Sequence, residues 1–301
     1  MTVRRLLFPE RQNQTHTFPL FMNLSSLKCA LTALFFLGLP LAAQQKIVIK
    51  GSDTLGAKML PQLAQVYKAL GNEVDFEIAA EGSTSAFTSL LAGTADIGMS
   101  SREISESEHD SFVAKGKEAF AHEAGTDLIA VVVNERNAIS SLTLQEIEGI
   151  FTREITDWSQ VGGKPGAISV YTRSTASGTY TSLQELAMNK RDYGSSTQKM
   201  NSNEAIAAEV GKNPNGIGYI SLAYARAEGV RTLSLGDITI ENEKYPLRRK
   251  IYFYTVGTPT GEVGKFLTWA TTNDTAKAII SKVGFIPPSL PETAEISTSE
   301  Q

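Results

Sequence analysis

One short pattern recurs along this chain: a strand-like apolar segment, then a cluster of Gly, Ser and Thr, then an amphipathic helical segment. Strands that alternate with helices predict an α/β fold in which most strands pair in parallel, because each helix returns the chain to the same edge of the sheet. The three copies of the pattern run over residues 46–70, 74–93 and 167–188.

The Gly/Ser/Thr clusters stand where a strand ends and a helix begins. The first turn of a helix leaves about four N–H groups without an intrahelical partner and carries roughly half a positive charge, so it can bind an anion without a cation. Hydroxyl side chains at the same place add donors of their own. The hydroxyl residues concerned are Ser52, Thr54, Ser83, Ser177 and Thr179.

The same residue types also cap helices, and for any one cluster a plain N-cap is the simpler interpretation. An arginine changes the balance in the third copy of the pattern. Arg173 ends its strand four residues before Ser177, where a guanidinium can bind two oxygens of one tetrahedral anion. Three clusters and one arginine together predict a shared site for a small oxyanion.

The charge balance limits which partners the chain can have. Its 301 residues include 28 Lys and Arg against 32 Asp and Glu, a net charge of −4, without a basic block. Binding to nucleic acid requires a basic face, so we expect no nucleic-acid partner. The length suits one large or two medium domains, and in the absence of a low-complexity linker we expect two lobes joined by more than one crossing of the chain.

The beginning of the chain has the pattern of an export signal. An apolar run at 29–41 follows Lys28 and precedes small residues up to Ala43, the order typical of a secretory signal peptide. The run is shorter than the roughly 20 apolar residues that cross a membrane. We therefore expect residues 1–43 to be a leader that is removed near Ala43 on export to the periplasm, with Met22 as an alternative start.

Few residues in the chain are suited to catalysis. The only cysteine, Cys29, lies in the predicted leader, so the exported chain has no thiol and no disulfide. The two histidines beyond the leader, His109 and His122, match no metal-ligand spacing. We therefore expect no catalytic residue, no metal site and no cofactor.

Six motifs in a fixed order give the chain a recognisable family likeness. Together they resemble the substrate-binding protein of the ABC-type phosphate transporter, and the likeness runs from about Ile47 to Pro288. No single motif decides it, because Gly and Ser near helix starts are common. The motifs are GSDTL (51–55), EGSTSAF (81–87), ADIGMSSRE (95–103), LTLQEIEGIFTREITDWSQVGG (142–163), YTRSTASGTY (171–180) and NGIGYIS (215–221).

The resemblance implies a two-lobed α/β fold, the type II periplasmic-binding-protein fold. Each lobe is then a mixed, mainly parallel sheet flanked by helices, and the ligand lies in the cleft between the lobes. We expect residues 44–130 and 255–290 to form the first lobe, residues 131–254 the second, and 291–301 a flexible tail. The lobes would hinge near Val131–Val133 and Tyr252–Tyr254.

The family's ligand-binding residues carry over to both lobes of this chain. In the first lobe they correspond to Thr54, to Leu55 through its N–H, and to Ser83. In the second lobe the corresponding residues are Arg173, Ser177, Gly178 and Thr179.

Two family acids are absent from this chain. The acid that accepts the phosphate proton would fall at Ser101, and the acid that supports the arginine would fall at Thr175. Asp53 or Glu81 can supply the missing acceptor, although a turn residue and a surface acid are the simpler interpretations of the two. Arg102, next to Ser101, is a candidate second cation or an ordinary surface arginine.

The resemblance implies an exported, monomeric protein that captures inorganic phosphate and delivers it transiently to an ABC transporter permease. The loss of the acid at Ser101 leaves sulfate, molybdate and tungstate as alternative ligands, since a buried carboxylate would discriminate against an anion that carries no proton. A secreted phosphatase and a phosphate-sensing module are the remaining alternatives. A hydrolase would need an activating base or a metal beside its nucleophile.

Overall fold

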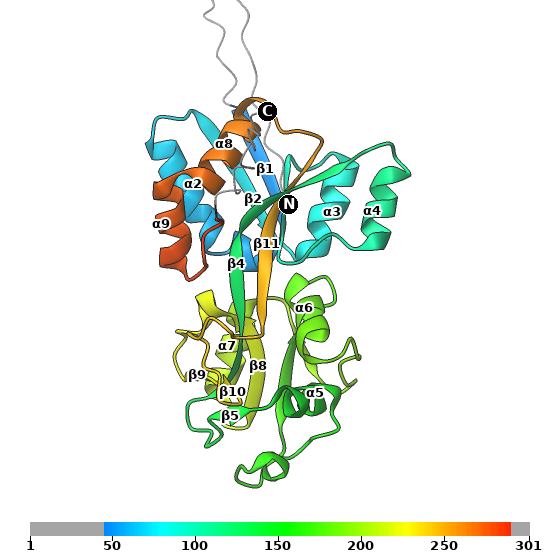
Figure 1. Ribbon diagram of the computed structural model, residues 1–301, viewed down its shortest axis with the longest axis vertical. Helices are drawn as coiled ribbons and strands as arrows, with labels where there is room; N and C mark the ends of the chain where they lie inside the picture. The colour runs from blue at the N-terminus through cyan, green and yellow to red at the C-terminus, as the bar shows by residue number, and fades with distance from the viewer. Residues whose placement is uncertain (1–44, 290–301) are drawn as a thin grey trace, which may run out of the picture. The chain divides into compact units, whose positions relative to one another are not determined.

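The computed structural model describes residues 45–289 (Figure 1). The predicted signal peptide over 1–43 and the predicted flexible tail over 291–301 lie outside these residues. Among the residues described, no helix combines the length and the apolar character needed to cross a bilayer.

The first group of elements, in the upper half of Figure 1, combines both ends of the described chain. Its N-terminal elements are β1 (Gln45–Gly51), α1 (Asp53–Gly56), α2 (Met59–Ala69), β2 (Val74–Ala80), α3 (Ser83–Ala92), β3 (Ile97–Ser100) and α4 (Glu106–Val113). Its C-terminal elements are α8 (Gly261–Thr272) and α9 (Asp274–Val283).

The second group, in the lower half of Figure 1, is built from the middle of the chain. It begins with β5 (Ser141–Leu142), α5 (Leu144–Thr152), the 3-10 turn η1 (Trp158–Val161), β6 (Ser169–Arg173), α6 (Gly178–Ala187) and β7 (Gln198–Met200). It continues with α7 (Asn203–Lys212), β8 (Gly216–Ser221), the 3-10 turn η2 (Leu222–Tyr224), β9 (Val230–Thr232) and β10 (Ser234–Leu235).

Two long strands, β4 (Ala119–Asn134) and β11 (Arg248–Val256), connect the groups. They pair antiparallel with each other, and they lie side by side in Figure 1 where the chain passes from the upper group to the lower one. The strands follow the order β2-β1-β3-β11-β4-β8-β6-β7, and β9 also pairs with β4. Because β1 pairs in parallel with β2 and β3, and β6 with β7 and β8, the predicted α/β fold with mainly parallel pairing in each half is confirmed.

Each group has its own hydrophobic core, and the two cores define the lobes. Residues from Ile47 to Ala124, together with Ile251 to Phe285, supply the first core, and residues from Leu128 to Leu247 supply the second. Tyr252 and Tyr254 join a smaller cluster with Phe87 on the first lobe. Residues 251–254, which we expected in the second lobe, therefore pack with the first.

The same observation shows where the residues of the expected hinges pack. Val131–Val133 pair with β8 inside the second core, and Tyr252–Tyr254 pair with β3 within the first lobe. The chain changes cores nearer Gly125, which has φ of 142°, and the strand register shifts between Ile251 and Tyr252. Both expected ranges lie on the strands that connect the two cores, but the sequence pattern did not show where along each strand the packing changes from one core to the other.

Two predicted helices are each divided in two. The helix expected over 54–70 breaks at Ala57 and Lys58, and Lys58 Nζ donates to the carbonyl of Ala223 in the second lobe at 3.1 Å. The sequence over 261–283 also has a helical pattern throughout, but the helix breaks at Asn273, whose extended backbone lets its side chain cap α9. The helical periodicity continues through both breaks, so it does not reveal them.

Candidate functional site

The three Gly/Ser/Thr clusters meet where the lobes face each other. Thr54 Oγ1 in α1 lies 3.2 Å from Thr179 Oγ1 in α6, and Ser83 Oγ in α3 lies 3.2 Å from Ser101 Oγ after β3. Gly178 connects the two pairs, because a Cβ built on it would stand 2.4 Å from Ser83 Oγ and 2.6 Å from Ser101 Oγ. The chain thus brings together hydroxyls that are more than a hundred residues apart in sequence.

Two glycines permit this close approach of the lobes. Any side chain at Gly178 would collide with the serines of the first lobe, so the start of α6 can reach them only without one. Gly82, with φ of 121°, faces the carbonyl of Ala176, to which Thr84 N–H donates at 3.1 Å. A Cβ on Gly82 would come within 2.7 Å of that carbonyl oxygen. Glycine is therefore required on both sides of the contact.

Among the hydroxyl residues of these clusters, Ser177 caps a helix, whereas Ser83 does not. Ser177 caps α6, because its Oγ accepts the N–H of Thr179 at 3.2 Å. Ser83 Oγ instead accepts the N–H of Ser101 at 3.0 Å, and α1 and α3 have no side-chain cap. Leu55 lies in α1 with its side chain in the first core, so only its main chain can contribute to a site.

Arg173 stands at the end of β6 with only 1% of its surface exposed. Its Nη2 donates to the carbonyl of Asn201 at 2.9 Å, and its own N–H donates to the hydroxyl of Tyr219 at 3.0 Å. Nε and Nη1 make no hydrogen bond to any described residue. Burial lowers the pKa of Arg173, and the nearby carboxylate of Asp53 opposes that shift.

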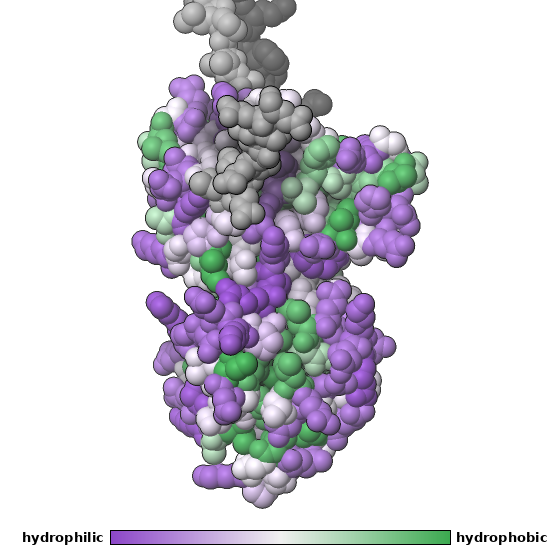
Figure 2. Space-filling model, in the orientation of Figure 1, coloured by the Kyte–Doolittle hydropathy of each residue, from purple (hydrophilic) through white to green (hydrophobic). Residues whose placement is uncertain are grey.

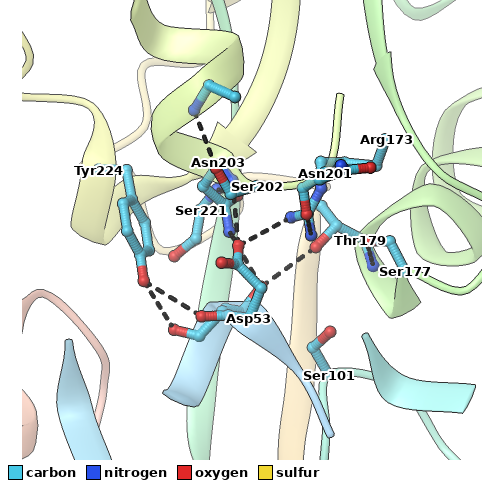
Figure 3. Close-up of polar contacts among 12 residues, drawn as sticks. Asp53, Ser101, Arg173, Ser177, Thr179, Asn201, Ser202, Asn203, Ser221 and Tyr224 are labelled. Atoms are coloured by element: carbon cyan, nitrogen blue, oxygen red, sulfur yellow. Dashed lines mark hydrogen bonds and ion pairs between the residues drawn. The ribbon is translucent and has the colours of Figure 1, made fainter. Parts of the chain in front are cut away.

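Asp53 is the acid that the structure places beside Arg173 (Figure 3). Its Oδ2 accepts the main-chain N–H of Asn203 at 3.0 Å and the Nδ2 of Asn203 at 2.7 Å. The same oxygen lies 3.1 Å from Nη1 of Arg173, at ion-pair distance. Glu81, the other acceptor considered, is exposed at the end of β2.

A second buried arginine, Arg249, was missed by the sequence analysis. Its Nη2 donates to Thr179 Oγ1 at 2.9 Å and to Thr54 Oγ1 at 3.4 Å, while Nη1 is buried without a hydrogen-bond partner among the described residues. Nε and Nη2 donate to Asp127 Oδ2 at 3.1 and 2.7 Å, and Ser221 donates to the other oxygen of Asp127 at 2.6 Å. Burial raises the pKa of Asp127, whereas Arg249 and Ser221 act to lower it.

Arg249 and Asp127 are direct partners across the β4–β11 ladder. The available signal was a pair of opposite charges beside apolar runs: Asp127 directly precedes the run at 128–133, and Arg249 lies two residues before Ile251 in β11. Arg102, the second cation considered before, is instead held by Glu108, with 2.7 Å between each guanidinium nitrogen and a carboxylate oxygen.

We call the following residues the polar cluster: Asp53, Thr54, Ser83, Ser101, Arg173, Ser177, Gly178, Thr179 and Arg249. All of them are buried. Its two guanidiniums are balanced by the carboxylates of Asp53 and Asp127, so any anion held here depends on directed hydrogen bonds more than on excess positive charge. A cavity of about 560 Å³ lies beside it, lined in part by Arg249 and Ser182, and Ser182 donates to the carbonyl of Ser101 at 3.4 Å.

Comparison with known proteins places this geometry in a family. The PBP superfamily domain matches residues 40–274. The chain belongs to the PBP superfamily. The phosphate-binding protein PstS of Pseudomonas aeruginosa is 29% identical over 266 residues, which cover 79% of this chain and 81% of that protein.

Two solved structures show the same fold. One, described as a phosphate ABC transporter substrate-binding protein with bound phosphate from Clostridium perfringens, matches with a TM-score of 0.74 and 26% identity, over 81% of this chain and all of that one. The other, an ABC-type phosphate transport receptor from Vibrio cholerae, matches with a TM-score of 0.65 and 28% identity, over 80% of this chain and all of that one. The resemblance found in the sequence and the two-lobed fold are therefore confirmed.

This member of the PBP superfamily has no acid at either position where the resemblance led us to look for one. Ser101 is buried and hydrogen-bonded to Ser83, so a hydroxyl stands where the proton-accepting acid was expected. Thr175, at the position of the supporting acid, is exposed. The acid beside Arg173 comes from the other lobe, as Asp53.

Proposed function

We propose that this protein is an exported solute-binding protein that captures inorganic phosphate between its lobes and delivers it to an ABC-type membrane permease. The observation that carries the proposal is the convergence of two buried guanidiniums on hydroxyls from both lobes. Arg173 Nε and Arg249 Nη1 make no hydrogen bond to a described residue, and Arg173 Nη1 has only its ion pair with Asp53. Nitrogen donors of this kind are costly to bury unless an acceptor reaches them.

In the proposed site, the phosphate oxygens accept hydrogen bonds from both lobes. Arg173 and Arg249 supply charge-assisted donors, and Thr54, Ser83 and Thr179 supply hydroxyls. The main-chain N–H groups of Leu55 and Gly178 stand in first turns of helices, which favour an anion. Phosphate has the oxygens to accept hydrogen bonds from all of these groups. The relatives of this chain have names that describe phosphate-binding proteins.

Binding and closure are coupled in this proposal. An anion that contacts both lobes binds the closed form more tightly than the open form, so it shifts the lobes toward closure. Micromolar affinity corresponds to about −8 kcal/mol, less than the sum of the individual bonds, because anion dehydration and lobe ordering oppose binding. The closed protein then docks on the permease as a monomer, after the predicted leader has directed its export to the periplasm.

Sulfate is the strongest alternative ligand, and Ser101 is the residue that favours it. A carboxylate at this position would accept the proton of phosphate and repel sulfate, whereas a hydroxyl does neither. Molybdate and tungstate belong to the same alternative.

We propose no enzymatic activity for the polar cluster. A phosphatase would need a base or a metal beside Ser83 or Ser177. His122 instead contacts Thr255, and no group of three or more His, Cys, Asp or Glu residues within 45–289 is placed to hold a metal ion.

Calorimetric titration of the purified protein with phosphate and then with sulfate, at two pH values, tests the proposal. We expect saturable phosphate binding and weaker sulfate binding. Saturable binding of sulfate alone would transfer the site to that anion, and the absence of binding heat with both anions would end the proposal. Steady hydrolysis of a chromogenic phosphoester, with or without divalent metal, would show that the protein is an enzyme.

A further inference from the structure

Asp53 connects the lobes in a way that the proposed function does not require. It belongs to α1 of the first lobe, yet its carboxylate contacts Asn203 and Arg173, which belong to the second. Figure 3 shows Asp53 facing these residues and Tyr224. Its exposed fraction is 5%, so all these contacts are buried.

The carboxylate oxygen Oδ2 is already heavily used by protein donors. It accepts two N–H groups from Asn203, the first residue of α7, where the partial positive charge of a helix start favours a carboxylate. Arg173 Nη1 adds a full positive charge 3.1 Å away. An acid whose oxygen is held by three nitrogen atoms of the opposite lobe is suited to joining lobes.

The loop that follows Arg173 does not provide a counter-ion of its own. Thr175 on that loop is exposed, and the side chain of Arg173 bonds within its lobe to a carbonyl, that of Asn201. The carboxylate beside the arginine is therefore supplied from across the cleft. If the lobes separate, the ion pair between Arg173 and Asp53 breaks, and Asn203 loses the acceptor of two hydrogen bonds.

Contacts around α1 fix the same junction. The hydroxyl of Tyr224 donates to the carbonyl of Asp53 at 3.2 Å. Lys58, just after α1, donates to the carbonyl of Ala223 and stands 4.1 Å from the centre of the Tyr224 ring. These contacts orient α1 against η2 of the second lobe, so the carboxylate of Asp53 meets its partners whenever the lobes are closed.

We propose that Asp53 is an interlobe latch: a positioning residue that stabilises the closed form through Arg173 and Asn203, independently of the anion. This inference rests on the proposed clamp-like function, because a latch has a role only if the lobes open. It assigns Asp53 a different role from that of proton acceptor for bound phosphate. The latch raises the closed fraction of the free protein, and affinity for every anion rises in proportion to that fraction.

The test compares Asp53→Asn with the wild type, using the exported protein freed of phosphate. Small-angle X-ray scattering measures how open the unliganded protein is. We expect a larger radius of gyration for Asp53→Asn, because a neutral amide cannot replace the carboxylate between Arg173 and Asn203. Glu81→Gln is the matched control, since it removes one exposed carboxylate near the cluster and should leave the scattering unchanged.

A second variant pair guards against simple misfolding. Asn203→Asp alone places two carboxylates in contact and should open the protein. Combining it with Asp53→Asn restores an amide beside a carboxylate and should return the radius of gyration toward the wild-type value. A double variant as open as the single variants, or an Asp53→Asn protein as compact as the wild type, would refute the latch.

Anion selectivity separates the latch from the proton acceptor. Titrations are made at a pH where phosphate is chiefly the singly protonated dianion, so that phosphate and sulfate carry equal charge. Loss of a latch weakens the binding of both anions by the same factor, about 10-fold for one charge-assisted contact. If the affinity of Asp53→Asn for sulfate instead rose relative to its affinity for phosphate, Asp53 would be the proton acceptor and the inference would be overturned. If the wild type binds no anion, the proposed function fails, and the scattering comparison still decides whether the latch exists.

Discussion

Substituting Arg249 by lysine tests whether the second arginine binds the anion or only pairs with Asp127. The two roles involve different nitrogen atoms. Nε and Nη2 hold Asp127 Oδ2 at 3.1 and 2.7 Å, whereas Nη1 is buried with no hydrogen-bond partner among the described residues. A lysine keeps the positive charge but has a single nitrogen, so it can satisfy Asp127 and leave the position of Nη1 without a donor.

The expected loss follows from that one donor. A hydrogen bond to a charged group contributes about 1.5 to 3 kcal/mol, so the dissociation constant for phosphate should rise roughly 10-fold to 150-fold in Arg249→Lys. Stability should fall by less than it would in Arg249→Ala, because removing the cation altogether leaves Asp127 buried without its partner, a loss of about 3 to 5 kcal/mol. Calorimetric titration and thermal unfolding without ligand measure the two effects separately.

Arg231→Lys is the matched control for this experiment. Arg231 also makes partly buried bonds within the second lobe, donating to the carbonyls of Asn137 and Ile139 at 2.7 and 2.6 Å, and it makes no hydrogen bond to a residue of the polar cluster. It should lower stability and leave phosphate affinity unchanged. A titration of Arg249→Lys that superimposes on the wild-type curve would show that Arg249 does not contact the anion.

Three further predictions concern other residues of the two lobes. Arg173→Ala should weaken phosphate binding by about 2 to 4 kcal/mol, as seen by calorimetry, because it removes a buried cation; unchanged binding would place Arg173 outside the site. Thr179→Val should weaken phosphate binding by about 1 to 3 kcal/mol, whereas Ser177→Ala should mainly cost about 1 kcal/mol of stability through the lost cap. If titration showed weaker binding only for Ser177→Ala, and thermal unfolding showed lower stability only for Thr179→Val, the two roles would be reversed. Burial raises the pKa of Glu108, but bonds from Arg102 and Ser105 outweigh it and hold that pKa below the ordinary 4.5. The resulting stability is present above pH 4.5 and is lost as the pH falls through the lowered pKa. The free energy of unfolding, measured with denaturant, should therefore fall less at acid pH in Glu108→Gln than in the wild type. An equal fall in both proteins would contradict the shift.

Local sequence determined the starts of the helices that carry the candidate site. The Gly/Ser/Thr clusters could be read without a structure, because capping and turn chemistry depends on neighbouring residues. The same pattern indicated Arg173 at the end of its strand. It could not show which hydroxyl caps and which does not, since that depends on where each side chain turns. Ser177 caps α6, while Thr179 faces Thr54 and Arg249.

The tertiary structure alone decided which distant residues meet. Arg249 reaches the cluster because the register of β4 and β11 sets it opposite Asp127, and a shift of one residue would turn its side chain to the other face of the sheet. Asp53 gains its role from Asn203, 150 residues away. A sequence read by its periodicity fixes the kind of element and the side chains it offers, whereas the pairing of charges across a cleft depends on strand register and lobe packing, which are set by contacts between residues far apart in the chain.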